Sequence, residues 1–147
     1  MASVLVLLLN DTPDQKLLET ANQHISGTDM SAVVCRLIDE SQYQSELPQN
    51  ARSGNELSSI DELEADATET AEAVVASTFD DDSAVTAHGI VGHIPDAILE
   101  FAAEHECEHI FVTGRKRSPV GKALFGDVAQ HVLLEFDGPV TVTTVDE

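Results

Sequence analysis

The feature of this sequence that most constrains its fold is a repeated change of hydrophobic period, from short apolar runs to helical patterns. Residues 4–9 form a continuous apolar run, which is typical of a strand covered on both faces of a parallel sheet. Further runs at 32–38, 84–91, 110–112 and 140–145 alternate with helical patterns. Because a helical crossover returns the chain in the same direction, five strands alternating with four helices predict an α/β fold with a doubly wound parallel sheet.

Local signals mark where the helices should begin and end. The segment Thr12-Pro13-Asp14-Gln15 combines a cap residue, a proline and a glutamine in the spacing of a helix start, and Gly27 is placed to end that helix. The segment Ser59-Ile60-Asp61-Glu62 predicts the start of the second helix, and Pro95 that of the third. The last helix is expected at residues 128–134.

Length and composition limit the class of protein. A chain of 147 residues with 42% hydrophobic residues predicts a single domain over residues 1–147, with a long polar connection at 41–58. The chain has no apolar run of about 18 residues, and its apolar start lacks the features of a signal peptide, so we expect a cytoplasmic protein with no membrane partner.

The charge balance is strongly acidic: 27 Asp and Glu against 7 Lys and Arg give a formal net charge of -20. This excess argues against binding to nucleic acid or to an anionic membrane. It also suits a salt-rich cytoplasm, because a Debye length of about 3 Å at 1 M salt screens the self-repulsion. We therefore expect a halophilic source.

Basic residues gather in one segment of this acidic chain. Four of the seven, Arg115, Lys116, Arg117 and Lys122, lie within eight positions between an expected strand and an expected helix. Backbone N–H groups at a helix start and guanidinium groups could together bind one anion, for which phosphate is the natural candidate. Alternatively, these side chains neutralise neighbouring carboxylates or dock an acidic partner protein.

A resemblance to a known family covers about 55 residues at the carboxyl end. The segments His93-Ile94-Pro95-Asp96-Ala97-Ile98-Leu99, Glu108-His109-Ile110-Phe111-Val112-Thr113-Gly114 and Gly138-Pro139-Val140-Thr141-Val142 resemble universal stress proteins (UspA-like) in order and spacing. This resemblance implies a Rossmann-like sheet in the order 3-2-1-4-5, whose order reverses between the first and fourth strands. In such sheets ligands bind beyond the carboxyl ends of the strands at that reversal.

The resemblance also implies a phosphate loop, with ATP, AMP or phosphate as the ligand. Nucleotide-binding members carry Gly, two residues, Gly, nine residues, then Gly followed by Ser or Thr. The residues implied here are Gly114, Arg115, Lys116, Arg117, Gly121, Lys122, Gly126 and Asp127.

The loop departs from this pattern in three respects. Eleven residues instead of twelve separate Gly114 from Gly126, Lys116 or Arg117 replaces the middle glycine, and Asp127 replaces the final Ser or Thr. A carboxylate about 4 Å from a phosphate oxygen repels it by about 1 kcal/mol in water. Asp127 is also a natural helix cap, so we expect a degenerate loop that holds an anion mainly through its basic side chains.

The expected base and ribose side comes from other strand ends. The resemblance implies Asn10, with Asp11 beside it, at the end of the first strand, and Ile38 and Thr113 at the ends of the second and fourth. The alternative for Asn10 and Asp11 is a purely structural role, because both residue types favour strand-to-helix turns.

The last strand is expected at the edge of the sheet. Family members pair this strand across a two-fold axis, so the resemblance implies a homodimer through Val140, Val142 and Thr144. The alternative is a monomer whose edge is guarded by Asp146 and Glu147.

Metal and catalytic chemistry find little support in the sequence. In the segment His105-Glu106-Cys107-Glu108-His109, side chains of zinc-ligand type fit no standard spacing, and we expect those of Cys107 and His109 to diverge. Both Cys35 and Cys107 are expected as reduced thiols, and no metal is expected. No nucleophile with a base can be named. We therefore expect a non-catalytic stress-response protein, or else a regulatory module that binds no nucleotide and docks partners through its basic loop.

Overall fold

The chain folds around one parallel sheet whose strand order is β3-β2-β1-β4-β5. The computed structural model describes residues 3–9, 14–39, 56–79, 84–94, 96–116 and 127–146. The strands are β1 (Ser3–Leu8), β2 (Ser31–Asp39), β3 (Val85–Gly92), β4 (Cys107–Lys116) and β5 (Val140–Asp146). The helices within these ranges are α1 (Gln15–Ile25), α3 (Glu56–Thr78), α4 (Asp96–Glu104) and α5 (Asp127–Glu135). The predicted α/β class and strand order are confirmed.

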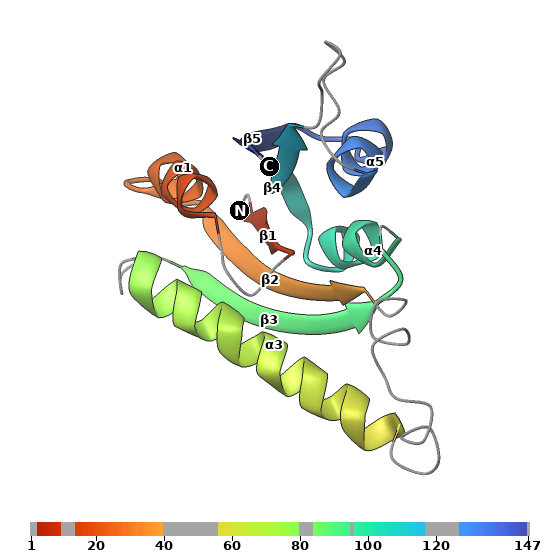
Figure 1. Ribbon diagram of the computed structural model, residues 1–147. Helices are drawn as coiled ribbons and strands as arrows, with labels where there is room; N and C mark the ends of the chain where they lie inside the picture. The colour runs from red at the N-terminus through yellow and green to blue at the C-terminus, as the bar shows by residue number, and fades with distance from the viewer. Residues whose placement is uncertain are drawn as a thin grey trace.

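Helices cover both faces of the sheet, as Figure 1 shows. Buried side chains of α1 and α3 form one core with Val4, Val6 and Leu8 of β1. Those of α4 and α5 form the other core with Leu5 and Leu7. All five of these β1 side chains are at most 2% exposed, because alternate residues of a strand point to opposite faces and both faces are covered. The continuous apolar run thus forms the central strand, as predicted.

The starts of α1 and α3 differ from the predicted starts by more than one residue. The cap of α1 is Asp14 and not Thr12, since the Asp14 side chain accepts a hydrogen bond from the backbone N–H of Lys16 at 3.1 Å. The predicted capping box at residues 59–62 lies inside α3, which already begins at Glu56. A capping pattern allows a helix to begin at that position, but it does not prevent the helix from beginning one turn earlier.

The fourth strand is longer than predicted. Residues 110–112 were expected, whereas β4 spans Cys107–Lys116 and pairs with β5 as far as Lys116 opposite Asp146. Most of the added residues are polar, so an apolar run could not predict them. A register shift between Ser3 and Val4, opposite the start of β4, separates Cys107 from the later residues of the strand.

Two glycines have a defined structural role. Gly27, with φ of +77°, follows the last turn of α1, as predicted. At Gly89 of β3, an added Cβ would lie 2.2 Å from the backbone nitrogen of Thr68 in α3. Only glycine allows α3 and β3 to approach so closely.

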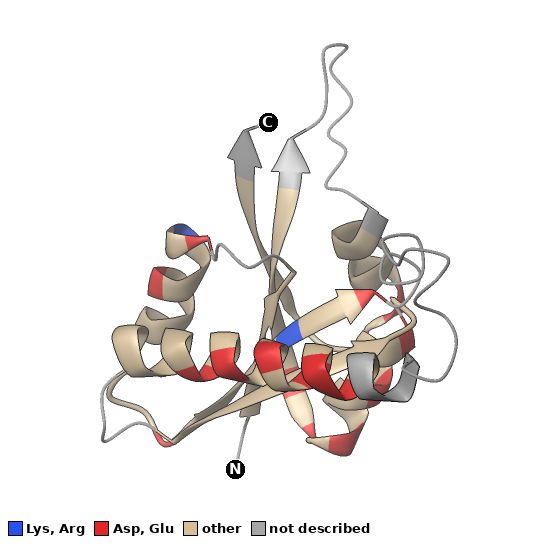
Figure 2. Cartoon of the chain, turned by 60° about the horizontal axis from the view of Figure 1, so that its bottom comes forward, with Lys and Arg blue, Asp and Glu red and all other residues tan. Residues whose placement is uncertain are grey.

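The exposed part of α3 is acidic, and Figure 2 shows the Asp and Glu positions in red along the helix. Exposed acids of this helix are Asp61, Glu62, Asp66, Glu69 and Glu72.

Among the helices in the described ranges, none is both long and apolar enough to span a membrane.

Candidate functional site

The candidate site lies at the edge of the sheet where the strands end, which we call the carboxyl edge. The strand order reverses at β1, whose neighbours are β2 on one side and β4 on the other. In doubly wound sheets this position collects the loops that bind ligands. The structure therefore places the end of β4, and with it the start of the basic segment, at the predicted point.

A polar cluster joins the start of α1 to the ends of β4 and β5; we call it the Asp14 cluster. Thr113 Oγ1 and Thr143 Oγ1 donate to the same carboxylate oxygen, Asp14 Oδ2, at 3.1 and 2.9 Å. The other oxygen, Oδ1, caps α1 through the N–H of Lys16. Thr143 is only 7% exposed, so its hydroxyl needs this acceptor.

A second contact lies beside the Asp14 cluster. The ammonium group of Lys16, an exposed residue in the first turn of α1, is 3.5 Å from the carbonyl oxygen of Thr144. The amino end of α1 is thus attached to β5 through one carboxylate and one ammonium group. Asp14, Lys16 and Thr143 were all missed from the sequence, because the contacts span about 130 positions and no local pattern reports them.

A buried cation lies on the β2 side of the carboxyl edge. Arg36 is level with Leu8, the last residue of β1, and is 9% exposed. Its Nη1 donates to the carbonyl oxygen of Leu37 at 2.6 Å. The sequence showed Arg36 only as a break in an apolar strand, and gave no sign that its side chain would be buried at this edge.

The predicted loop residues divide into three groups. Gly114 is buried in β4, and Arg115 and Lys116 end that strand opposite Val145 and Asp146. Asp127 is the first residue of α5 and its side chain is not among those described, so its role as a helix cap stays a prediction. Outside the described residues lie Arg117, Gly121, Lys122 and Gly126.

The predicted base and ribose side is brought together only in part. Thr113 belongs to the Asp14 cluster, whereas half-buried Ile38 lies on β2, which β1 separates from β4. Asn10 and Asp11 lie outside the described residues. Asp14, which follows these two residues in the sequence, is the acid that accepts a hydrogen bond from Thr113 at this edge.

The side chains of the segment from His105 to His109 diverge, as predicted. Cys107 packs in the α4 and α5 core, whereas His109 contacts His24 of α1 on the opposite face. Among the described residues, no three side chains of His, Cys, Asp or Glu lie close enough together to hold a metal ion. Burial raises the pKa of Cys107 to about 11 and that of Cys35 to about 12, so both free thiols stay protonated.

The comparisons with known proteins identify both the family and the fold. The family model described as "Universal stress protein family" matches residues 1–144. A universal stress protein from Archaeoglobus fulgidus shares the fold with a TM-score of 0.67 and 23% identity, covering 97% of this chain and 98% of its own. UspA from Lactobacillus plantarum gives a TM-score of 0.65 at 18% identity, covering 96% of both chains.

A third structure, a universal stress protein in complex with cAMP, gives a TM-score of 0.57 at 17% identity, covering 97% of this chain and 96% of its own. No curated protein matches the chain at a significant level. The family match covers almost the whole length, and the observed strand order agrees with the one that the resemblance implied. The chain belongs to the universal stress protein family.

Proposed function

We propose that this chain is a non-catalytic stress-response protein that binds a phosphorylated ligand, with an adenine nucleotide as the first candidate, at the carboxyl edge of its sheet. The observation that carries the proposal is the end of β4. Gly114 to Lys116 open the basic segment there, and Thr113, one position earlier, belongs to the Asp14 cluster. A related protein solved with cAMP supports the choice of ligand class.

Charge divides the proposed site into two parts. The carboxylate of Asp14 disfavours a phosphate group beside it, because like charges repel by about 1 kcal/mol at 4 Å even in water. Phosphate therefore belongs with Arg115, Lys116, Arg117 and Lys122, where guanidinium and ammonium groups concentrate. The neutral part of the ligand faces the Asp14 cluster, whose oxygens accept hydrogen bonds.

Calorimetry tests this proposal. ATP, AMP, cAMP and inorganic phosphate are titrated into the protein in high and in low salt, and we expect binding that weakens at least tenfold in the triple variant R115A/K116A/R117A. Two single variants give a matched comparison: Arg117→Ala removes one positive charge from the basic segment, and the control Arg52→Ala removes one positive charge outside it. Equal affinities in these two variants, or heat from none of the four ligands, would contradict the proposal.

The same protein preparations test the absence of catalysis. Among the described residues, no serine or cysteine contacts a histidine side chain or a carboxylate that would activate it. We therefore expect no ADP after long incubation with ATP and Mg²⁺. Steady ADP formation that the triple variant abolishes would show an enzyme instead. A protein partner that the triple variant loses, without any ligand heat, would identify the basic segment as a docking element.

We also propose a homodimer through β5. In the described sheet, β5 is an edge strand that pairs with β4. The carbonyl oxygen of Pro139 accepts a hydrogen bond from the N–H of Ile110 in β4. Because the backbone groups of successive strand residues point to alternate sides, those of Val140, Val142 and Thr144 point away from β4. Thr144 agrees with this, since its carbonyl reaches Lys16.

Light scattering after size exclusion tests the dimer. Val142→Pro removes one outward N–H, which an edge strand tolerates but strand pairing across a two-fold axis does not. We expect a dimer that becomes a monomer in this variant and persists in the control Val142→Thr. A wild-type monomer over the accessible concentration range would contradict the proposal.

A further inference from the structure

Four of the six histidines form two pairs of touching rings on opposite faces of the sheet. His24 and His109 have ring centroids 4.9 Å apart, and His88 and His105 have centroids 5.0 Å apart. Each pair connects the carboxyl end of a helix to a strand. We call them the α1 pair and the α4 pair.

The α1 pair lies between the last turn of α1 and β4. His109 stacks on Phe111 with centroids 4.5 Å apart and 12° between the ring planes, and His24 contacts the same phenylalanine at 5.3 Å. The Nε2 of His109 is 2.7 Å from the Thr141 hydroxyl of β5. The imidazole of His109 is thus held from three elements.

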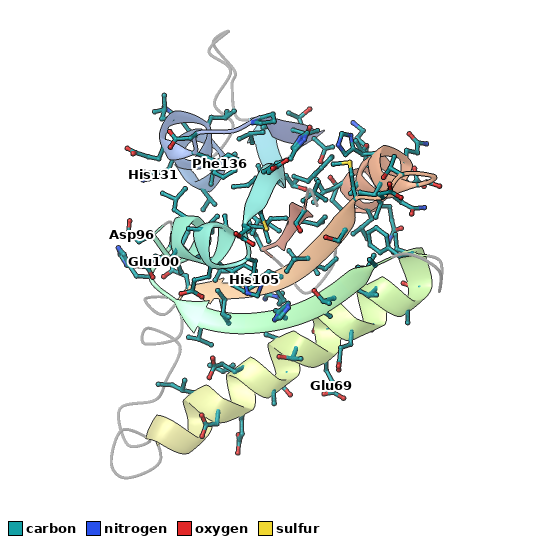
Figure 3. All side chains as sticks on the ribbon, turned by 180° about the vertical axis from the view of Figure 1, so that it is seen from behind. Glu69, Asp96, Glu100, His105, His131 and Phe136 are labelled. Atoms are coloured by element: carbon teal, nitrogen blue, oxygen red, sulfur yellow. The ribbon has the colours of Figure 1, made fainter. Side chains whose placement is uncertain are left out.

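The α4 pair lies between the end of α4 and β3. His105 packs on Phe101 at 4.1 Å, and His88 contacts the same ring at 5.4 Å. Figure 3 shows His105 beside β3, whereas His131 is carried by α5. This pair repeats the composition of the α1 pair, with two imidazoles and one phenylalanine.

Among the described residues, the groups that contact each pair carry no negative charge. Around His109, α1 presents His24, β1 presents Val4 as register partner, and β5 presents Thr141. Among the described residues, neither imidazole of this pair forms an ion pair with a carboxylate.

Around His88, α4 presents Phe101, the turn after α4 presents His105, and β2 presents Cys35, whose raised pKa of about 12 keeps it neutral. No carboxylate of the described part of the chain forms an ion pair with this pair either. A second proton in either pair therefore meets a like charge, with no described counter-ion beside it.

Burial, and then the neighbouring histidine, lowers the pKa of His109 and that of His88 below the ordinary value of 6.5. A histidine whose pKa is lowered by folding takes up its proton more readily in the unfolded chain. Its contribution to stability is present above pH 6.5 and is lost as the pH falls below that value.

We propose that the two histidine pairs make the attachment of α1 and α4 to the sheet acid-sensitive, so that double protonation of a pair loosens the helix that it holds. The two pairs act on opposite faces and through separate helices. Mild acid therefore weakens both cores, and it does so at the ends of α1 and α4 that lie away from the carboxyl edge.

Unfolding by urea between about pH 7.5 and about 5.5 tests the proposal, because histidine changes its charge in this range. In the wild type, each imidazole that stays neutral in the folded state raises the equilibrium constant for unfolding by up to about tenfold for each unit by which the pH falls. The increase is smaller where water reaches the ring. The double variant H88Q/H109Q removes from each pair the ring whose pKa is lowered and should show a clearly flatter pH dependence. His131→Gln, in a histidine outside both pairs, is the matched control.

An unchanged slope in the double variant, or an equal loss of slope in His131→Gln, would overturn the proposal. If the double variant does not fold, the wild type still decides through titration of its histidine ring protons by NMR. The rings of His88 and His109 should then titrate below the range of free histidine, and amide protection in α1 and α4 should fall before that in α3. Ordinary titration of both rings would contradict the acid response.

Discussion

The two strands that flank β4 differ in almost every respect. In β1, all five residues from Val4 to Leu8 are apolar and at most 2% exposed, and they divide between the two cores. In β5, valine and threonine alternate, and Val140 and Val142 pack only partly buried on the α4 and α5 core. Both faces of β1 pack in the core, whereas β5 packs with one face and forms polar contacts with the other.

The threonines of β5 show what this difference achieves. Thr141 contacts the ring of His109, Thr143 donates to Asp14, and the carbonyl of Thr144 lies beside Lys16. Every one of these contacts is polar, and two of them reach the amino end of α1. Substitutions in β1 should therefore act on global stability, whereas substitutions around β5 should act on the carboxyl edge and on assembly.

The largest expected effect is in β1. Leu5→Ala removes a fully buried side chain from the centre of the molecule and should lower the free energy of unfolding by about 2–5 kcal/mol. The corresponding change in β5, Val142→Ala, removes a half-buried side chain and should cost about 1 kcal/mol or less. Urea unfolding measures both. Equal losses would show that the two strands contribute equally to the core.

The contrast between the strands also explains how far the sequence predicts the fold. A continuous apolar run has one good solution, a strand covered on both faces, so β1 and the fold class could be predicted from residues 4–9 and their repeats. The polar additions to β4 could not. Thr113 gains its stability from Asp14 and Thr143, contacts that appear only when the chain is folded.

The candidate site was predictable to a similar degree. The end of β4 and the basic residues that follow it form a local pattern, and the strand order places that pattern at the reversal point. The positions of Asp14 and Arg36 at the carboxyl edge could not be predicted from a local sequence pattern. An aspartate near a helix start and an arginine in a strand acquire their positions from residues on other strands, which sequence spacing does not record.

The second effect tests the Asp14 cluster. Asp14→Ala removes the cap of α1 and the acceptor of two threonine hydroxyls, so the free energy of unfolding should fall by about 1–3 kcal/mol. Asp14→Asn keeps an oxygen at this position and should lose about half as much. Thermal and urea unfolding of both variants provide the measurement.

Asp29→Ala is the control for charge, because it removes one negative charge from an exposed residue that follows α1. Relief of repulsion in a chain of net charge -20 would affect both aspartates alike. If Asp14→Ala is no less stable than Asp29→Ala, the cluster makes no net contribution, and the link between α1 and β5 is only a contact.

The smallest effect concerns the turn that leads into β4, the strand that joins β1 to β5. Glu106 is exposed and has φ of +53°, a left-handed conformation that costs an ordinary residue about 1–2 kcal/mol. Glycine removes that cost but loses more entropy on folding, so Glu106→Gly should stabilise the protein by about 0.5–1 kcal/mol. Glu106→Ala removes the same charge yet keeps a Cβ, and it should give no such gain in thermal unfolding. The turn leads into β4 and not into β5, so the gain in stability from Glu106→Gly should be the same when Val142→Pro is also present. If the gain is lost in that combination, the stability of the turn depends on β5.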